Sequence, residues 1–220
     1  MINLFLQDSA ATDLLLGFRT HEIEKSLYEK ARLKRPEGSH KTWGHYLHEG
    51  NQTWVGLDPE TLQTPYLELK EMCDLLKPKT NSTLVDLGAG YGRLGLVLEA
   101  LYPTTSFCGY EYVSERVEEG KRIFKALNLS KAELHVQDLT ADSFCLPPAD
   151  YYFLYDYGEV AHIRKTLKQL EEMGDKHSFK VIARGKGSRS LIQYEHPWLS
   201  DVYTPVHREN YSIYSMAADN

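Results

Sequence analysis

The fold is decided by the stretch Leu84-Val85-Asp86-Leu87-Gly88-Ala89-Gly90-Tyr91-Gly92-Arg93-Leu94-Gly95. A short apolar run ends at Asp86, and glycines alternate at positions 88, 90 and 92. Helical spacing of i, i+3, i+4 and i+7 follows in Leu94, Val97, Leu98 and Leu101. Glycine lets a ligand approach the main chain closely, and the first N–H groups of a helix have no partner within it. The stretch therefore predicts a strand, a tight turn and a helix that bind a nucleotide-like ligand.

Two classes of ligand compete for this turn. A dinucleotide-binding turn requires Gly-x-Gly-x-x-Gly, and Arg93 stands here in place of the third glycine. Asp86, two residues before the first glycine, can accept backbone N–H groups of the turn or face the ammonium of an amino-acid-like ligand. A nicotinamide dinucleotide carries no such cation. Asp86 therefore favours an adenosyl amino acid, and a nicotinamide cofactor remains the alternative.

Two further acids follow the next two predicted strands. The strand at 106–111 ends in Glu111, and the strand at 132–136 is followed by Asp138. Ligands of open α/β sheets bind beyond the carboxyl ends of the strands, which share one edge. Glu111 can accept the ribose hydroxyls, and Asp138 can accept an adenine amino group while Leu139 donates its backbone N–H. Three acids at three successive strand ends are not expected by chance.

On these residues the chain, from about Thr83 to Met216, resembles the class I S-adenosylmethionine (SAM)-dependent methyltransferases. The resemblance implies an α/β fold with a three-layer, Rossmann-like, seven-stranded sheet, mostly parallel with an antiparallel C-terminal strand. It also implies SAM as cofactor and S-adenosylhomocysteine (SAH) as product. The cofactor-binding residues that it implies are Asp86, Gly88, Ala89, Gly90, Glu111, Tyr112, Asp138, Leu139 and Tyr155.

The predicted chemistry lies after the fourth strand (150–154), at Tyr155-Asp156-Tyr157-Gly158-Glu159. Methyl transfer is an in-line displacement, so the enzyme mainly positions the acceptor. Asp156 and Tyr157 are the predicted catalytic residues, because they can orient an amine or a hydroxyl. The alternative is that Asp156 caps a helix and the tyrosines pack. Members of the family that methylate exocyclic or amide nitrogens often carry Asn-Pro-Pro-Tyr here, and this chain departs from that motif.

The methyl acceptor is less constrained than the cofactor. The loop 63–66, followed by the glycine turn, is somewhat similar to small seven-strand protein-lysine methyltransferases. The predicted function is therefore methyl transfer to a protein, with lysine as one candidate, or to a small molecule. A SAM-binding regulatory protein without catalysis is a further alternative.

Residues 1–57 are less regular than the predicted methyltransferase domain, 58–220. Helices are expected at 10–18 and 19–34. Between them and the domain, His40, His45 and His48 could bind a metal, but no His-Glu-x-x-His motif is present. We therefore expect a polar aromatic loop and no metal site. The aromatic residues expected to cover a ligand as a lid are Trp43, Tyr46 and Trp54.

Charge and cysteine usage narrow the class of protein. A net charge of −6 argues against gripping nucleic acid mainly through its phosphates. No basic leader with an apolar core and no long apolar run is present, so neither a signal peptide nor a membrane span is expected. Cys73, Cys108 and Cys145 are far apart, which favours a reducing compartment and a cytoplasmic protein over disulfides or zinc.

Three later segments carry structural expectations. The charged residues between 115 and 122 are expected to form a solvated helix face. Residues 185–189 are expected to form a flexible basic loop on the ligand side. A closing pair of strands is expected at 201–207 and 211–216, which corresponds to the antiparallel end of the family's sheet.

Overall fold

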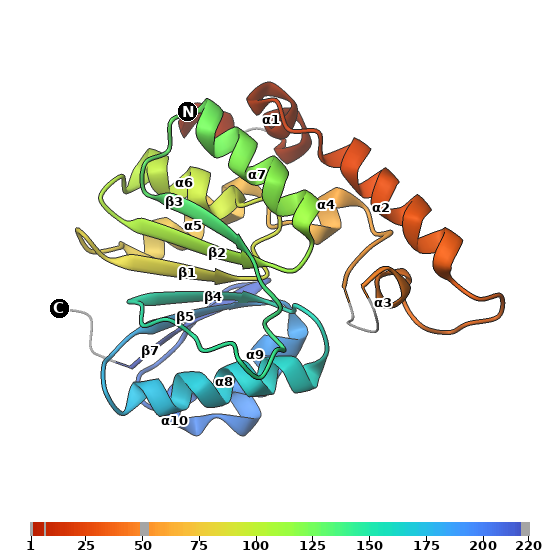
Figure 1. Ribbon diagram of the computed structural model, residues 1–220. Helices are drawn as coiled ribbons and strands as arrows, with labels where there is room; N and C mark the ends of the chain where they lie inside the picture. Colours follow the sequence, from red (N-terminus) through yellow and green to blue (C-terminus); the bar gives the residue numbers. More distant parts are fainter. Residues whose placement is uncertain (1, 7, 49–52, 217–220) are drawn as a thin grey trace.

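A seven-stranded sheet is the centre of the computed structural model, which describes residues 2–6, 8–48 and 53–216. The strand order is β3-β2-β1-β4-β5-β7-β6, and β7 is antiparallel to both of its neighbours (Figure 1). The strands are β1 (Thr83–Leu87), β2 (Ser106–Glu111), β3 (Ala132–Val136), β4 (Tyr151–Tyr155), β5 (Lys180–Arg184), β6 (Val206–His207) and β7 (Tyr211–Ser215). The predicted fold class is confirmed.

Helices cover both faces of the sheet, with α5, α6 and α7 on one side and α8, α9 and α10 on the other (Figure 1). The N-terminal helices α2, α3 and α4 lie toward the side to which the arrowheads of β1 and β2 point. The helices are η1 (Ile2–Leu6), α1 (Ser9–Leu16), α2 (Thr20–Lys34), α3 (Trp43–Leu47), α4 (Pro59–Leu62), α5 (Tyr66–Leu76), α6 (Arg93–Leu101), α7 (Ser114–Ala126), α8 (Val160–Gly174), α9 (Lys186–Glu195) and α10 (Pro197–Ser200).

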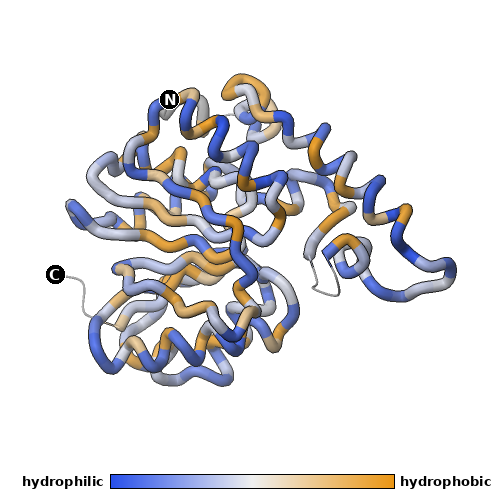
Figure 2. The backbone as a smooth tube through the Cα atoms, in the orientation of Figure 1, coloured by the Kyte–Doolittle hydropathy of each residue, from blue (hydrophilic) through white to orange (hydrophobic). Residues whose placement is uncertain are grey.

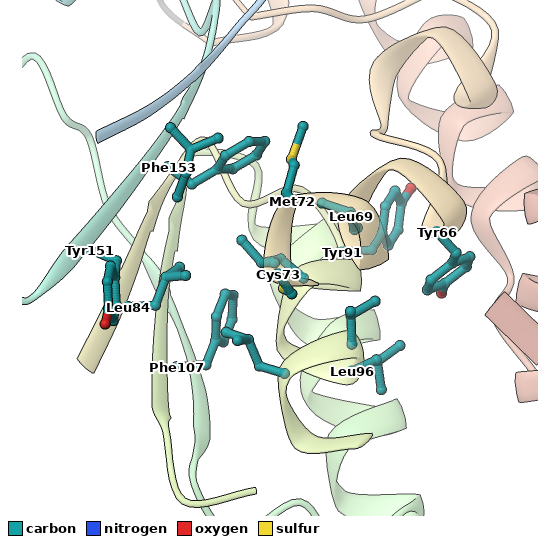
Figure 3. Packing of buried hydrophobic residues seen from close by; sticks show 14 of the residues in the cluster. Tyr66, Leu69, Met72, Cys73, Leu84, Tyr91, Leu96, Phe107, Tyr151 and Phe153 are labelled. Atoms are coloured by element: carbon teal, nitrogen blue, oxygen red, sulfur yellow. The ribbon is translucent and has the colours of Figure 1, made fainter. Parts of the chain in front are cut away.

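The core is divided between the two faces because side chains alternate along each strand. In β4, Tyr151 and Phe153 join the cluster under α5 and α6, whereas Tyr152 and Leu154 join the cluster under α8. Figure 3 shows the first cluster, in which α5 contributes Tyr66, Leu69, Met72 and Cys73. The central strands are largely apolar in Figure 2, while the outer helices alternate between hydrophilic and hydrophobic residues.

Buried ion pairs connect the N-terminal helices to the sheet domain. Arg93, at the start of α6, is 3% exposed, and its Nη2 lies 2.6 Å from Oδ2 of Asp13 in α1. Arg116 of α7 is 6% exposed, and its Nε lies 2.7 Å from Oε1 of Glu24 in α2. A buried arginine requires such a partner, since an unpaired buried charge is strongly destabilising. The boundary between residues 57 and 58 stays a prediction.

The expected solvated face of α7 is wrong for two residues. Arg116 and Glu119 are 6% and 2% exposed. The carboxylate of Glu119 accepts hydrogen bonds from Arg19, at the start of α2, and from Arg122. Spacing along α7 could not indicate this burial, because the N-terminal segment covers the helix.

Two C-terminal expectations also need correction. Residues 185–189 are not a flexible loop, because α9 begins at Lys186 and the Asp156 carboxylate accepts from the backbone N–H groups of Gly187 and Ser188. In the segment 201–207 only Val206 and His207 form a strand. The short helix α10 (Pro197–Ser200), with proline at its start, was not expected.

Candidate active site

A cavity of about 290 Å³ lies at the carboxyl ends of β1, β2 and β4 and beside the loop that follows β3. This edge holds the switch point of the strand order, where ligands of open α/β sheets bind. The core contributes Gly88, Gly90, Tyr91, Glu111, Tyr112, Arg116, Gln137, Asp138, Leu139, Thr140, Tyr155, Asp156, Tyr157, Gly158 and His162. The segment before the sheet contributes Thr53, Trp54, Leu57, Thr61, Leu62 and Gln63.

The glycine turn passes directly along the cavity. The N–H groups of Gly88 and Ala89 both donate to the main-chain oxygen of Tyr110, at 2.9 Å each. Gly88 has φ 90°, and a Cβ there would lie 2.9 Å from Cβ of Tyr157. Gly90 has φ 55°, and a Cβ there would meet nothing within 4 Å. Both positions need glycine for their backbone angles, and Gly90 leaves open space for a ligand against the main chain.

Glu111, at the end of β2, is 7% exposed and lines the cavity. Its Oε2 accepts from the Gly90 N–H at 3.0 Å, and its Oε1 accepts from the Val113 N–H at 2.9 Å. An ionised carboxylate has about four acceptor positions. About two therefore remain for a ligand, and the two backbone bonds fix the carboxylate against the glycine turn.

Asp138 and Leu139 line the cavity after β3, as the resemblance implies. Oδ1 of Asp138 accepts from both the backbone N–H and the hydroxyl of Thr140, at 2.8 and 2.7 Å. These bonds hold the carboxylate in place at the strand end. Tyr112 and Tyr155 add aromatic surface to the same cavity.

Two of the implied residues, Asp86 and Ala89, do not line the cavity. Asp86 is 4% exposed within β1, between Gly109 of β2 and Phe153 of β4. Burial, together with the negative charge of Glu111, raises the pKa of its carboxyl group well above the usual value. Asp86 is therefore an acid whose charged form is costly until a cation approaches it.

The polar atoms of the predicted catalytic pair already have partners within the protein. Oδ1 of Asp156 accepts from the Ser188 N–H and hydroxyl at 2.7 and 2.8 Å, which caps the start of α9. The Tyr157 hydroxyl bonds to Thr166, and burial raises the pKa of this phenol to about 12. The side chain of Tyr157 is therefore neutral at pH 7. Its role and that of Asp156 in catalysis stay predictions.

One of the three predicted lid residues reaches the cavity. Trp54 lines it, and its indole Nε1 donates to the main-chain oxygen of Asp156 at 2.9 Å. Trp43 instead packs against Tyr28, and the Arg35 guanidinium lies 4.3 Å from the centre of its ring. Tyr46 bonds to Ser39 and does not line the cavity.

Among the cavity residues that the sequence did not indicate are Gln63, His162 and Arg116. Gln63 is 7% exposed, and its side-chain Nε2 has no hydrogen-bond partner among the described residues. His162 accepts from the Glu159 N–H at Nδ1, which places the proton of the neutral ring on Nε2. Arg116 was grouped with the solvated charges of α7. The positions of Gln63 and Arg116 at the cavity depend on contacts between distant segments, which no local spacing indicates.

The described ranges (2–6, 8–48 and 53–216) contain neither a metal-binding cluster nor a membrane-spanning helix. No group of three or more His, Cys, Asp or Glu residues there could hold a metal ion. No helix in those ranges is both long and apolar enough to cross a membrane.

Comparison with known proteins shows likeness in structure and none in sequence. No family model and no curated protein sequence matches the chain. An RNA methyltransferase from Salinibacter ruber in complex with SAH has TM-score 0.52 and 18% identity, over 72% of this chain and 95% of that one. A SAM-dependent methyltransferase from Aquifex aeolicus has TM-score 0.51 and 15% identity, over 72% and 98%.

TrmN from Thermus thermophilus also has TM-score 0.51 and 15% identity, over 70% of this chain. The match covers only 48% of the length of TrmN. At such identities the likeness concerns the fold. Together with the strand order, it shows that the chain has the fold of the class I SAM-dependent methyltransferases.

Proposed function

From this fold and the cavity at its switch point, we propose that the protein is a SAM-dependent methyltransferase. One observation carries the proposal. Glu111 and Asp138, which follow two neighbouring parallel strands, line the same cavity as Gly88 and Gly90. This combination supplies two fixed carboxylates for hydroxyl and amino groups, beside a main chain that a ligand can approach.

The donor and acceptor set of the cavity suits an adenosyl amino acid. Glu111 keeps acceptor capacity for ribose hydroxyls, and Asp138 with Leu139 offers an acceptor and a backbone donor for adenine. Tyr112 and Tyr155 offer aromatic surface. The side-chain Nε2 of Gln63, which has no partner among the described residues, offers a donor for a carboxylate. The carboxyl of Asp86, which is buried in β1 and does not itself line the cavity, gains from a nearby ammonium. We assign the amino-acid end of the cofactor to these last two residues.

Bound SAM supplies a methyl group on a sulfonium with a good, neutral leaving group. The chain's own residues position the acceptor and exclude water, and Trp54 forms part of the cavity wall. Deprotonation is needed only for an acceptor that arrives protonated, such as a lysine. Asp156 and Tyr157 stay our predicted orienting residues. His162 is a further polar group that lines the cavity.

The direct test is calorimetric titration of the folded protein with SAM and with SAH. We expect both ligands to bind. Glu111→Ala should weaken the binding of SAH by about tenfold to a hundredfold, because a hydrogen bond to a charged group contributes about 1.5–3 kcal/mol. Absence of binding by either ligand overturns the proposal. A thermal shift with NAD(H) or NADP(H) would favour the nicotinamide alternative instead.

We propose two classes of methyl acceptor: a protein side chain, such as lysine, or a small molecule. Transfer of a radiolabelled methyl group into a lysate distinguishes them by whether the label enters protein or small molecules. SAM binding without any transfer would identify a regulatory SAM-binding protein. The cytoplasmic location stays a prediction.

A further inference from the structure

Arg116 lies between two carboxylates from distant parts of the chain. Its Nε and Nη2 donate to Oε1 and Oε2 of Glu24 in α2, at 2.7 and 3.1 Å. Its Nη1 lies 3.7 Å from Oε1 of Glu111, which is within charge attraction but too long for a hydrogen bond. The bidentate pair with Glu24 therefore fixes a guanidinium that would otherwise have Glu111 as its carboxylate partner.

We propose that Glu24 is a positioning residue for cofactor binding: it holds Arg116 so that Glu111 keeps free acceptor positions for the ribose. This inference rests on the proposed function. Each oxygen of Glu111 already accepts one backbone N–H, so each has about one acceptor position left. A direct bond from Arg116 would occupy one of the two, and a ribose hydroxyl would lose it.

Further contacts connect Glu24 and Arg116 to residues that line the cavity. The Tyr91 hydroxyl donates to Oε1 of Glu24 at 2.9 Å, and Nη2 of Arg116 donates to the Trp54 main-chain oxygen at 2.6 Å. Glu24 is 4% exposed and does not line the cavity, so water has little access to replace a partner lost there. Burial alone would lower the pKa of Arg116, but Glu111 and Glu24 outweigh it and raise that pKa, which keeps the guanidinium charged.

Glu119, in the same helix as Arg116, provides a matched control for Glu24. It is also buried, at 2% exposure, and it also joins α7 to the N-terminal segment, through Arg19. It does not line the cavity. A change at Glu119 therefore disturbs the packing of the N-terminal segment without altering the charges around Glu111.

The experiment compares Glu24→Gln with Glu119→Gln, using SAH and its 2′-deoxy analogue as titrants at neutral pH. We expect wild type and Glu119→Gln to bind SAH on the order of tenfold more tightly than the analogue, because a hydrogen bond to a charged acceptor is lost. In Glu24→Gln we expect SAH to bind on the order of tenfold more weakly, and the preference over the analogue to fall below about threefold. A merely structural role would weaken both ligands equally.

The outcomes separate the two proposals. No binding of SAH by wild type overturns the proposed function and this inference with it. Normal binding by wild type with an unchanged preference in Glu24→Gln overturns the inference alone. Should Glu24→Gln not fold, Glu24→Asp tests the same pair, since a shorter carboxylate holds Arg116 less well. We expect its ligand preference to fall between those of wild type and Glu24→Gln, and an unchanged preference would again contradict the role.

Discussion

The indole Nε1 of Trp54 donates a hydrogen bond to the main-chain oxygen of Asp156, at 2.9 Å. The main-chain oxygen of the same tryptophan accepts from Arg116 of α7 at 2.6 Å. Trp54 therefore connects α7 with the end of β4, on two sides of the cavity that it lines. A segment that precedes the sheet in sequence thus forms a wall of the candidate site.

Replacing Trp54 tests this wall. Trp54→Phe keeps an aromatic ring but loses the bond to Asp156, which contributes about 0.5–1.5 kcal/mol. We expect the dissociation constant of SAH to rise roughly twofold to tenfold, measured by calorimetry. Trp43→Phe is the control, because Trp43 lies outside the cavity lining. Equal effects of the two substitutions would contradict the distinction.

The buried pair of Arg93 and Asp13 is predicted to be important for stability. The Asp13 carboxylate accepts from Nη2 of Arg93 at 2.6 Å and from the Tyr66 hydroxyl at 2.8 Å. Asp13→Asn leaves a buried guanidinium whose one remaining acidic partner among the described residues is Glu60. We expect the free energy of unfolding in urea to fall by about 3 kcal/mol.

The control for that measurement is Asp74→Asn, which breaks an exposed pair with Lys70 one turn away. Its cost should be about 0.3–0.5 kcal/mol. If the two substitutions changed the free energy of unfolding equally, the Arg93 pair would not have the assigned importance.

The lowered pKa of Glu119 predicts that the protein loses stability in acid. Burial alone would raise the pKa of the Glu119 carboxyl group, but hydrogen bonds from Arg122 and Arg19 outweigh burial and lower the pKa to about 2. Because the folded-state pKa is the lower one, this stabilisation is present above the unfolded value near 4.5 and is lost as the pH falls toward 2. It amounts to roughly 3 kcal/mol, at about 1.4 kcal/mol per pKa unit.

Urea unfolding across that pH range measures the effect. The free energy of unfolding should fall more steeply with decreasing pH in wild type than in Glu119→Gln, because the variant has no carboxyl group to titrate at this position. Identical slopes would show that the arginines do not stabilise the charged form.

The raised pKa of the buried Asp86 carboxyl group predicts that the protein releases a proton when it binds SAH. The pKa of Asp86 is raised by burial and by Glu111, so below that raised value the free protein carries a protonated Asp86. The positive charge of the SAH ammonium stabilises the ionised form of Asp86 over the protonated form. The affinity for SAH should therefore rise with pH from about pH 4 up to the raised pKa and then level off.

Calorimetry in two buffers of different ionisation enthalpy counts the released protons. The Asp86→Asn variant should release no proton on binding SAH. Wild type should release none on binding 5′-methylthioadenosine, which has no ammonium. Equal release with 5′-methylthioadenosine would assign the proton to another group.

The predicted secondary structure was accurate for several elements with a regular local pattern. The predicted ranges for β2 and β3 match the structure, and the helix predicted at 19–34 is α2 (Thr20–Lys34). The start of α9 was missed, because its capping carboxylate is Asp156, 31 residues away from Gly187. Apolar spacing cannot reveal such a distant cap.

The sequence by itself determined individual strands, the glycine turn and the placement of Glu111 and Asp138 at one edge of the sheet. Those features follow from periodicity along single elements and from the shared edge of parallel strands. Only the tertiary structure decided which other groups surround the cavity. Arg116 has its partner Glu24 at a separation of 92 residues, and Arg93 has Asp13 at 80. Burial makes these charges depend on one another, and that dependence arises only when the N-terminal helices pack against α6 and α7.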